Sequence, residues 1–235
     1  TAPQDLAFNT DGTKMFVVGS AGDAVNEYTL STGFDVSTAT FVHSFSVSSL
    51  DTAPQGLAFN TDGTKMFVLG NSGIDVNEYT LSTGFDVSTA SFVDSFSVSS
   101  QDLAPYGLAF NTDGTKMFVV GTIGDDVNEY TLSTGFDVST ASFVDSFSVS
   151  SQEAVPVGLA FNTDGTKMFV VGHEGDDVTE YSLTTPFSLV NVSGEHSGDV
   201  INTSSTDNYD TDPDDDTLTV THIQHSGAGS STSVT

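Results

Sequence analysis

The sequence has no cysteine, no tryptophan and no arginine, and its basic side chains other than histidine are four lysines. Without cysteine, disulfide bonds cannot stabilise the fold, and the redox compartment cannot be inferred. The 32 acidic residues bring the formal net charge to −28. So few cations cannot neutralise phosphates, which argues against nucleic acid and anionic membrane surfaces as partners. Divalent cations or a salty medium suit this composition better.

The sequence also lacks any apolar run long enough for a transmembrane helix, so membrane insertion is not expected. No secretory leader is visible, because the first residues, TAPQDLAF, begin in the middle of a pattern that returns later. We therefore expect a processed or partial chain. Apolar residues make up 37%, which is low but compatible with an all-β protein rich in serine and threonine.

What the sequence does contain is a long internal repeat. The string NTDGTKMFV starts at Asn9, Asn60, Asn111 and Asn162, which gives a period of 51 residues. A fixed period of this size indicates a repeat architecture. The pattern covers residues 1–190, and residues 191–235 do not repeat, so we predict two regions with this boundary.

Each repeat contains four short strand signals separated by turn-forming residues. In the second copy they are Leu57–Asn60, Lys65–Gly70, Val76–Ser82 and Ser91–Ser97, and no segment has a helical period. Four short antiparallel strands per repeat are typical of a β-propeller blade. We therefore predict an all-β fold, a β-propeller of four four-stranded blades followed by an extended C-terminal β segment. The last strand of the fourth blade is expected to be shortened, at Ser188–Ser193.

The repeated string resembles the S-P-D-G-x-x-(L/I)-x-V hairpin of YVTN and WD40-like (PD40-type) propeller repeats of secreted bacterial surface proteins. In the second copy the matching residues include Asn60, Asp62, Gly63 and Lys65, and the proline of the pattern is replaced by Thr61. The resemblance implies the propeller fold. It implies no single function, because that family includes sensors, binding platforms and enzymes.

Two further contacts are predicted from the repeat. The lysine at the start of the second strand should pair with a glutamate on the third strand, as Lys14 with Glu27, and an exposed pair contributes at most about 1 kcal/mol. Alternatively, the lysines only reduce repulsion in an acidic protein. Phenylalanines of the first and second strands should pack between blades: Phe8, Phe59, Phe110, Phe161, Phe16, Phe67, Phe118 and Phe169.

Differences between copies two and three gather at the end of the second strand, in the loop after it and in the connection to the next blade. In a propeller these loops emerge on one face, so this face is the candidate ligand-binding surface. Unconstrained drift of the loops is the alternative. The candidate residues are Asp75, Tyr106, Asp125, Asp126, His173, Glu174, Asp176 and Asp177. Their carboxylates could hold Ca²⁺, or they could form a solvated acidic rim.

No catalytic motif is present, and nearly identical repeats argue against the localised, asymmetric set of groups that catalysis needs. The sequence therefore predicts that the protein is not an enzyme.

The acidic string DTDPDDDTLTVT in the tail resembles the strand entry of bacterial VCBS and cadherin-like adhesin domains. The resemblance implies Ca²⁺ binding by Asp210, Asp212, Asp214 and Asp216, and a solvated linker is the alternative. Leu218, Val220 and Ile223 predict a strand that adds to the sheet edge of a neighbouring subunit or domain. Asn191 and Asn202 lie in glycosylation sequons.

Together these features predict a non-enzymatic, extracellular structural or adhesive repeat module. It would belong to a larger cell-surface protein or self-associate as the subunit of an extracellular fibre. The alternative is a glycan- or ligand-binding propeller that uses the variable loop face.

Overall fold

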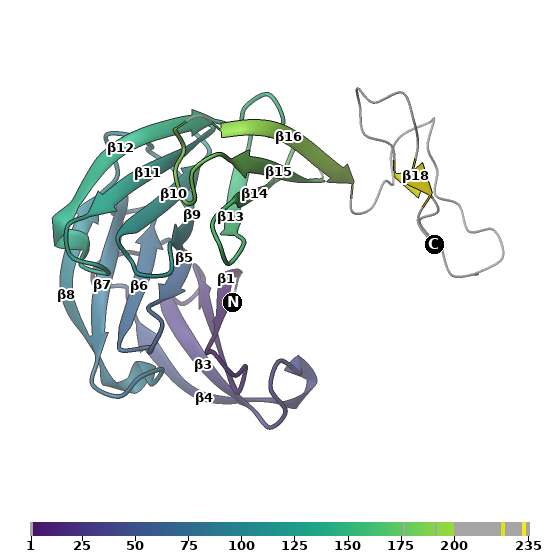
Figure 1. Ribbon diagram of the computed structural model, residues 1–235. Helices are drawn as coiled ribbons and strands as arrows, with labels where there is room; N and C mark the ends of the chain where they lie inside the picture. Colours follow the sequence, from purple (N-terminus) through teal and green to yellow (C-terminus); the bar gives the residue numbers. More distant parts are fainter. Residues whose placement is uncertain (1, 176, 191, 200–221, 224–231, 234–235) are drawn as a thin grey trace. The chain divides into compact units, whose positions relative to one another are not determined.

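A computed structural model describes residues 2–175, 177–190, 192–199, 222–223 and 232–233. The chain divides into two compact units, Thr1–Val200 and Ile201–Thr235. The first unit holds four four-stranded antiparallel sheets, which are the blades of a β-propeller (Figure 1). The predicted fold class is thereby confirmed.

The strands of every blade follow one another in sequence order, from the innermost to the outermost. Blade 1 contains β1 (Pro3–Phe8), β2 (Lys14–Gly19), β3 (Ala24–Leu30) and β4 (Ala39–Ser46). Blade 2 contains β5 (Pro54–Phe59), β6 (Lys65–Gly70), β7 (Asp75–Leu81) and β8 (Ala90–Ser97). Blade 3 contains β9 (Pro105–Phe110), β10 (Lys116–Gly121), β11 (Asp126–Leu132) and β12 (Ala141–Ser148). Blade 4 contains β13 (Pro156–Phe161), β14 (Lys167–Gly172), β15 (Asp177–Leu183) and β16 (Val192–Asp199).

Short 3₁₀ helices precede the outermost strands of the first three blades: η1 (Val36–Thr38), η2 (Val87–Thr89) and η3 (Val138–Thr140). In the second unit, the described residues form β17 (His222–Ile223) and β18 (Thr232–Ser233), which pair antiparallel.

The outermost strand of blade 4 differs from the prediction. It is β16, which pairs with β15 from Val192 to Asp199, so the shortened strand expected at Ser188–Ser193 is wrong. The residues of β16 lie in the first compact unit, beyond the boundary expected at residue 190. Outermost strands are mostly exposed, as in β8. Backbone pairing is therefore enough to hold such a strand. The sequence SGEHSGD lacks the alternating apolar residues from which a strand is predicted, so this strand was not expected here.

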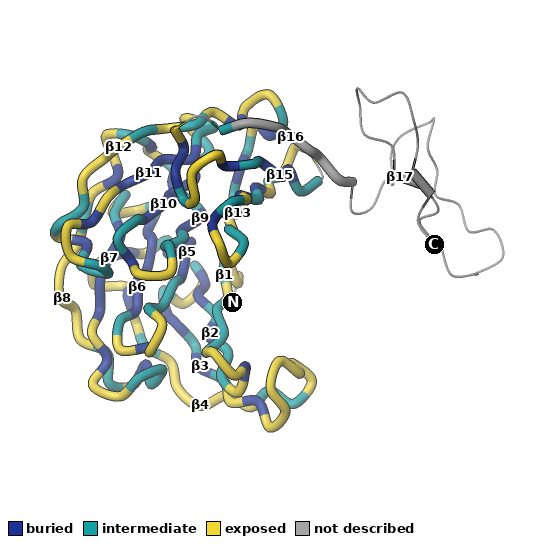
Figure 2. The backbone as a smooth tube through the Cα atoms, viewed as in Figure 1, coloured by how far each residue is buried: buried dark blue, intermediate teal, exposed yellow. Residues whose placement is uncertain are grey.

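The core consists of apolar clusters between successive blades, and the outermost strands β4, β8 and β12 are mostly exposed (Figure 2). At the first interface, Phe16 of β2 packs against the ring of Phe59 on β5, with ring centroids 4.5 Å apart. The pairs Phe67–Phe110 and Phe118–Phe161 repeat this contact at the same 4.5 Å spacing. The prediction is confirmed for these six rings, whereas Phe8 packs against Phe34 of its own blade and Phe169 is half-buried in blade 4.

The repeated turn is determined by local hydrogen bonds and by one aromatic ring. In the second copy, Asp62 Oδ1 accepts from the backbone nitrogen of Thr64 at 3.0 Å and from its hydroxyl at 2.6 Å. These bonds hold the pKa of Asp62 below its usual value. Gly63 has a φ of +72°, and a Cβ there would lie 2.2 Å from Phe85 Cδ2. Only glycine fits beneath this ring, which explains why the turn is preserved in every copy.

The predicted lysine–glutamate pairs occur in all four blades: Lys14–Glu27, Lys65–Glu78, Lys116–Glu129 and Lys167–Glu180. They are not the exposed pairs that we expected. The side chain of Glu78 is only 2% exposed, because each of the first three pairs also binds the next blade.

Lys65 Nζ donates to Glu78 Oε1 at 2.7 Å and to the backbone carbonyl of Phe136 at 2.5 Å. Glu78 Oε2 accepts from the backbone nitrogen of Val138 at 2.9 Å. We call this arrangement the inter-blade latch. Blades 1 and 3 form the same latch with Phe85 and Val87, and with Phe187 and Leu189, respectively.

Candidate functional site

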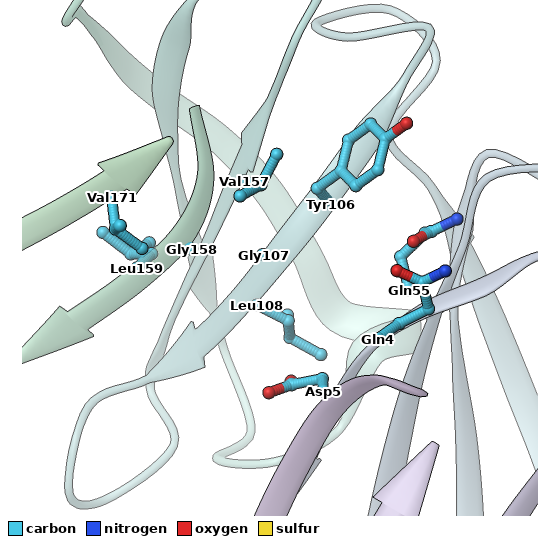
Figure 3. A pocket seen from close by; sticks show the side chains of 10 residues that line it. All are labelled: Gln4, Asp5, Gln55, Tyr106, Gly107, Leu108, Val157, Gly158, Leu159 and Val171. Atoms are coloured by element: carbon cyan, nitrogen blue, oxygen red, sulfur yellow. The ribbon is translucent and has the colours of Figure 1, made fainter. Parts of the chain in front are cut away.

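The inner strands of all four blades border one cavity of about 270 Å³ (Figure 3). Its lining residues are Gln4, Asp5, Gln55, Tyr106, Gly107, Leu108, Val157, Gly158, Leu159 and Val171. Nine of these ten residues come from β1, β5, β9 and β13, and Val171 comes from β14. The cavity therefore lies where the innermost strands converge.

The inner strands differ from one another only at residues that line this cavity or at their equivalents. Their sequences are PQDLAF, PQGLAF, PYGLAF and PVGLAF. The second position holds Gln4, Gln55, Tyr106 or Val157, and the third holds Asp5 or a glycine. The remaining four positions are identical. On these strands the four copies therefore differ only at positions that line the cavity or correspond to lining positions.

Asp5 is the only carboxylate among the described lining residues. Its Oδ2 accepts from the backbone nitrogen of Leu57 in blade 2 at 2.8 Å, and its Oδ1 accepts from Leu6 N at 2.8 Å. Burial raises the pKa of Asp5 above its usual value, although both hydrogen bonds act in the opposite direction. Asp5 is thus a fixed carboxylate with increased basicity.

Equivalent positions in the other blades leave little space for such a side chain. A Cβ added to Gly56 would lie 3.1 Å from the carbonyl oxygen of Tyr106, and one added to Gly107 would lie 3.1 Å from the carbonyl oxygen of Val157. The inner strands of blades 2 to 4 therefore approach one another closely, and the carboxylate is confined to blade 1.

The other polar side chains that line the cavity are Gln4 of the same strand, and Gln55 and Tyr106 of the next two blades. Gln55 is 8% exposed, and its Oε1 is buried with no hydrogen-bond partner among the described residues. Gln4 Nε2 donates to Ser20 Oγ at 3.0 Å, and Tyr106 adds a half-buried phenol. Leu108, Leu159 and Val157 supply apolar wall, and no lysine or histidine is among the described lining residues. The cavity can therefore bind a small, uncharged molecule with hydroxyl groups and accept a proton at Asp5.

Of the residues predicted on the variable face, Tyr106 lies in this cavity. Asp75 and Asp126 instead begin β7 and β11, and burial raises the pKa of both carboxyls. Asp75 accepts from Asn77 Nδ2 at 2.7 Å. Asp125 adopts a φ of 51°, and its Oδ1 is buried without a partner among the described residues.

In blade 4, His173 and Glu174 are exposed and Asp177 begins β15. Backbone nitrogens of Glu174 and Gly175 donate to Glu153, which lies in the connection before β13. Asp51 and Asp102 hold the loops of blades 2 and 3 in the same way, through Gly73 and Gly124. These bonds show that the loop between the second and third strands of a blade lies on the same face as the connection to that blade, as predicted. They also show that Asp51, Asp102 and Glu153 stabilise these loops.

No group of three or more histidine or acidic side chains in the described part of the chain is arranged to hold a metal ion. Several candidate residues lie outside the described residues: Asp176, Asn191, Asn202, Asp210, Asp212, Asp214, Asp216, Leu218 and Val220. Ile223 lies in β17 and pairs with Thr232 of β18 within its own unit. No helix in the part of the chain that the structure describes could span a membrane.

Sequence reasoning missed Gln4, Asp5 and Gln55. A comparison of the first strand across all four copies would have found them, since the variable positions are adjacent there.

No family model and no curated protein matches this sequence. Solved structures show the same fold at low identity. A "putative 6-phosphogluconolactonase" from Bacteroides uniformis is 11% identical, with a TM-score of 0.56 over 77% of this chain and 50% of that chain. The periplasmic gluconolactonase of Pseudomonas aeruginosa is 16% identical, with a TM-score of 0.52 over 77% of this chain and 49% of that chain.

The β-propeller domain of Cps50 from Myceliophteria thermophila is 10% identical, with a TM-score of 0.52 over 77% of this chain and 54% of that chain. The chain thus spans about half the length of the solved structures it matches. The propeller is confirmed, whereas the resemblances to YVTN-like repeats and to adhesin domains stay predictions.

The comparisons overturn the predicted function. We expected a non-enzymatic adhesive module, but three of the similar structures are named as 6-phosphogluconolactonases or as a gluconolactonase. Our argument against an enzyme relied on the near identity of the repeats. That argument overlooked the inner strands, which differ from one another at residues that line the cavity.

Proposed function

We propose that the central cavity binds the lactone of an uncharged sugar acid and that Asp5 is the general base for its hydrolysis. The observation that carries this proposal is the single carboxylate of raised pKa, fixed in a cavity beside Gln4, Gln55 and Tyr106. The names of the similar structures support the reaction class.

In the proposed reaction, Asp5 takes a proton from a water molecule whose oxygen attacks the lactone carbonyl carbon. The ester bond to the ring oxygen then breaks, and that oxygen receives the proton as the leaving hydroxyl. The product is the open-chain sugar acid. A carboxylate of raised pKa is the better base, because general-base efficiency increases as the pKa approaches the working pH.

The same cavity disfavours a phosphorylated substrate. All four lysines of the sequence are paired with glutamates, and none lies among the described lining residues. A net charge of −28 also repels anions from the protein as a whole. Gln55 Oε1 would instead accept a hydrogen bond from a sugar hydroxyl, which would satisfy this buried oxygen.

The test is acid release from glucono-δ-lactone, measured above the spontaneous rate. We expect Asp5→Asn to remove the activity, Gln55→Leu to raise KM, and the 6-phosphorylated lactone to react more slowly. Activity should fall at acid pH as Asp5 becomes protonated, at a pH above the usual aspartate range. Asp11→Asn, a change at an exposed turn, is the matched control.

An unchanged rate in Asp5→Asn, or a wild-type rate equal to the spontaneous one, would contradict the proposal. Binding of the lactone without hydrolysis would leave a sugar-binding role and exclude Asp5 as a catalytic base. We also propose that the protein works outside the cytoplasm, a location supported by its acidic composition and by the periplasmic gluconolactonase. Cell fractionation with a cytoplasmic marker enzyme tests this location.

A further inference from the structure

Blade 1 exposes apolar side chains whose equivalents in blades 2 and 3 are buried. Leu6 is 55% exposed, whereas the equivalent Leu57 is 4% exposed. Val36 of η1 is 61% exposed, whereas Val87 and Val138 at the same position are completely buried. In blades 2 and 3 these residues pack on the preceding blade. The free lateral face of blade 1 is thus the kind of surface that is buried at the internal interfaces.

Blade 4 exposes the opposite lateral face. Val171 of β14 is 41% exposed, whereas Leu69 and Val120 at the same position are completely buried. The side chains of Lys167 and Glu180 are 46% and 27% exposed, compared with 29% and 2% for Lys65 and Glu78. This face would receive a following blade.

These two free faces carry the two halves of one latch. Blade 4 presents Lys167 and Glu180, already joined by an ion pair. Blade 1 presents the backbone carbonyl of Phe34 and the backbone nitrogen of Val36, the equivalents of the groups that Lys14 and Glu27 bind in blade 2. The segment GFDVSTA is identical in blades 1 and 2. Among the described residues, no hydrogen bond joins either of these halves to another blade.

We propose that a second copy of this chain docks head to tail, with blade 4 of one copy on blade 1 of the other. A second copy is the occupant because the chain already forms this interface three times within itself. Two copies would contribute eight blades and close a ring through two identical interfaces.

Charge opposes this assembly at low ionic strength, because each copy has a net charge of −28. Salt reduces the repulsion between distant charges, with a Debye length of about 8 Å at 0.15 M. The latch and the apolar contacts become shielded from water when the faces meet, so salt weakens them less. Assembly should therefore strengthen as salt is added. It would also cover the cavity at Val171, which belongs to both the cavity wall and the free face.

The test is the mass of the full chain by sedimentation velocity, across protein concentrations at moderate salt. We expect a concentration-dependent species of twice the 24.5 kDa chain mass. Val36→Asp and Glu180→Lys should each abolish it, because each changes one of the two faces. The matched control is Val93→Asp on the outermost strand β8, where Val93 is 49% exposed and the change should not alter assembly.

A mixture of the two variants identifies the head-to-tail arrangement. The Val36→Asp chain keeps a native blade 4 and the Glu180→Lys chain keeps a native blade 1, so the mixture should form dimers that neither variant forms alone. Circular dichroism checks that both variants fold. A monomer at all concentrations, dimers that survive both changes, or a mixture without dimers would each overturn the proposal.

Discussion

Val36 and Val87 occupy the same position in identical seven-residue segments, yet Val87 is completely buried and Val36 is 61% exposed. The difference lies in the neighbouring blade. Blade 1 packs against Val87 through Phe16 and Val18, whereas no described residue packs against η1 in this way. Whether a residue of this fold is buried therefore depends on the neighbouring copy. The contacts between blades thus contribute to the stability of each repeat.

The largest expected effect compares the same ring at an internal face and at a free face. Phe67 is completely buried between blades 2 and 3, whereas Phe169 is only half-buried on the free side of blade 4. Phe67→Ala should lower the free energy of unfolding by about 3–5 kcal/mol through cavity formation. Phe169→Ala should cost less than half as much. Urea unfolding measures both, and equal losses would mean that blade 4 is covered in solution.

A second pair of changes compares the latch with its free half. Glu78→Gln removes a buried charge that binds Lys65 and Val138, so unfolding should become easier by about 2–3 kcal/mol. The value lies below that of a fully buried pair because Lys65 is partly exposed. Glu180→Gln breaks an exposed pair and should cost less than about 1 kcal/mol. Both variants should be measured at a concentration where the chain is monomeric.

A third comparison is a pH dependence at an internal interface. Burial, with the charges of Asp75 and Asp51, raises the pKa of Tyr79 to about 12. The neutral phenol is favoured in the folded state, so its contribution to stability is complete below pH ~10 and is lost as the pH rises toward ~12. Thermal melts between these values should show the loss, and Tyr79→Phe should reduce it. An identical pH dependence in Tyr79→Phe would exclude this tyrosine as the cause.

Local sequence signals were enough for the strands, the turn and the lysine–glutamate pairs. The period of 51 residues, the Asp-Gly pair and the alternation of apolar residues are all short-range features. Strand β16 was misplaced because an outermost strand is held by backbone pairing and needs no apolar alternation. The variable positions at the cavity are visible once the first strand is aligned across all four copies, but that Asp5, Gln55 and Tyr106 line one cavity follows only from the convergence of the inner strands.

The sequence by itself determined the blade, because each blade is closed by turns and strand pairs within about fifty residues. Only the tertiary structure decided which copies of an identical residue are buried and which are exposed. Burial depends on the blade alongside, so Glu78 is hidden within a latch while Glu180 remains partly open to water. The tertiary structure also raised the pKa of Asp5, because desolvation of a carboxylate depends on everything packed around it.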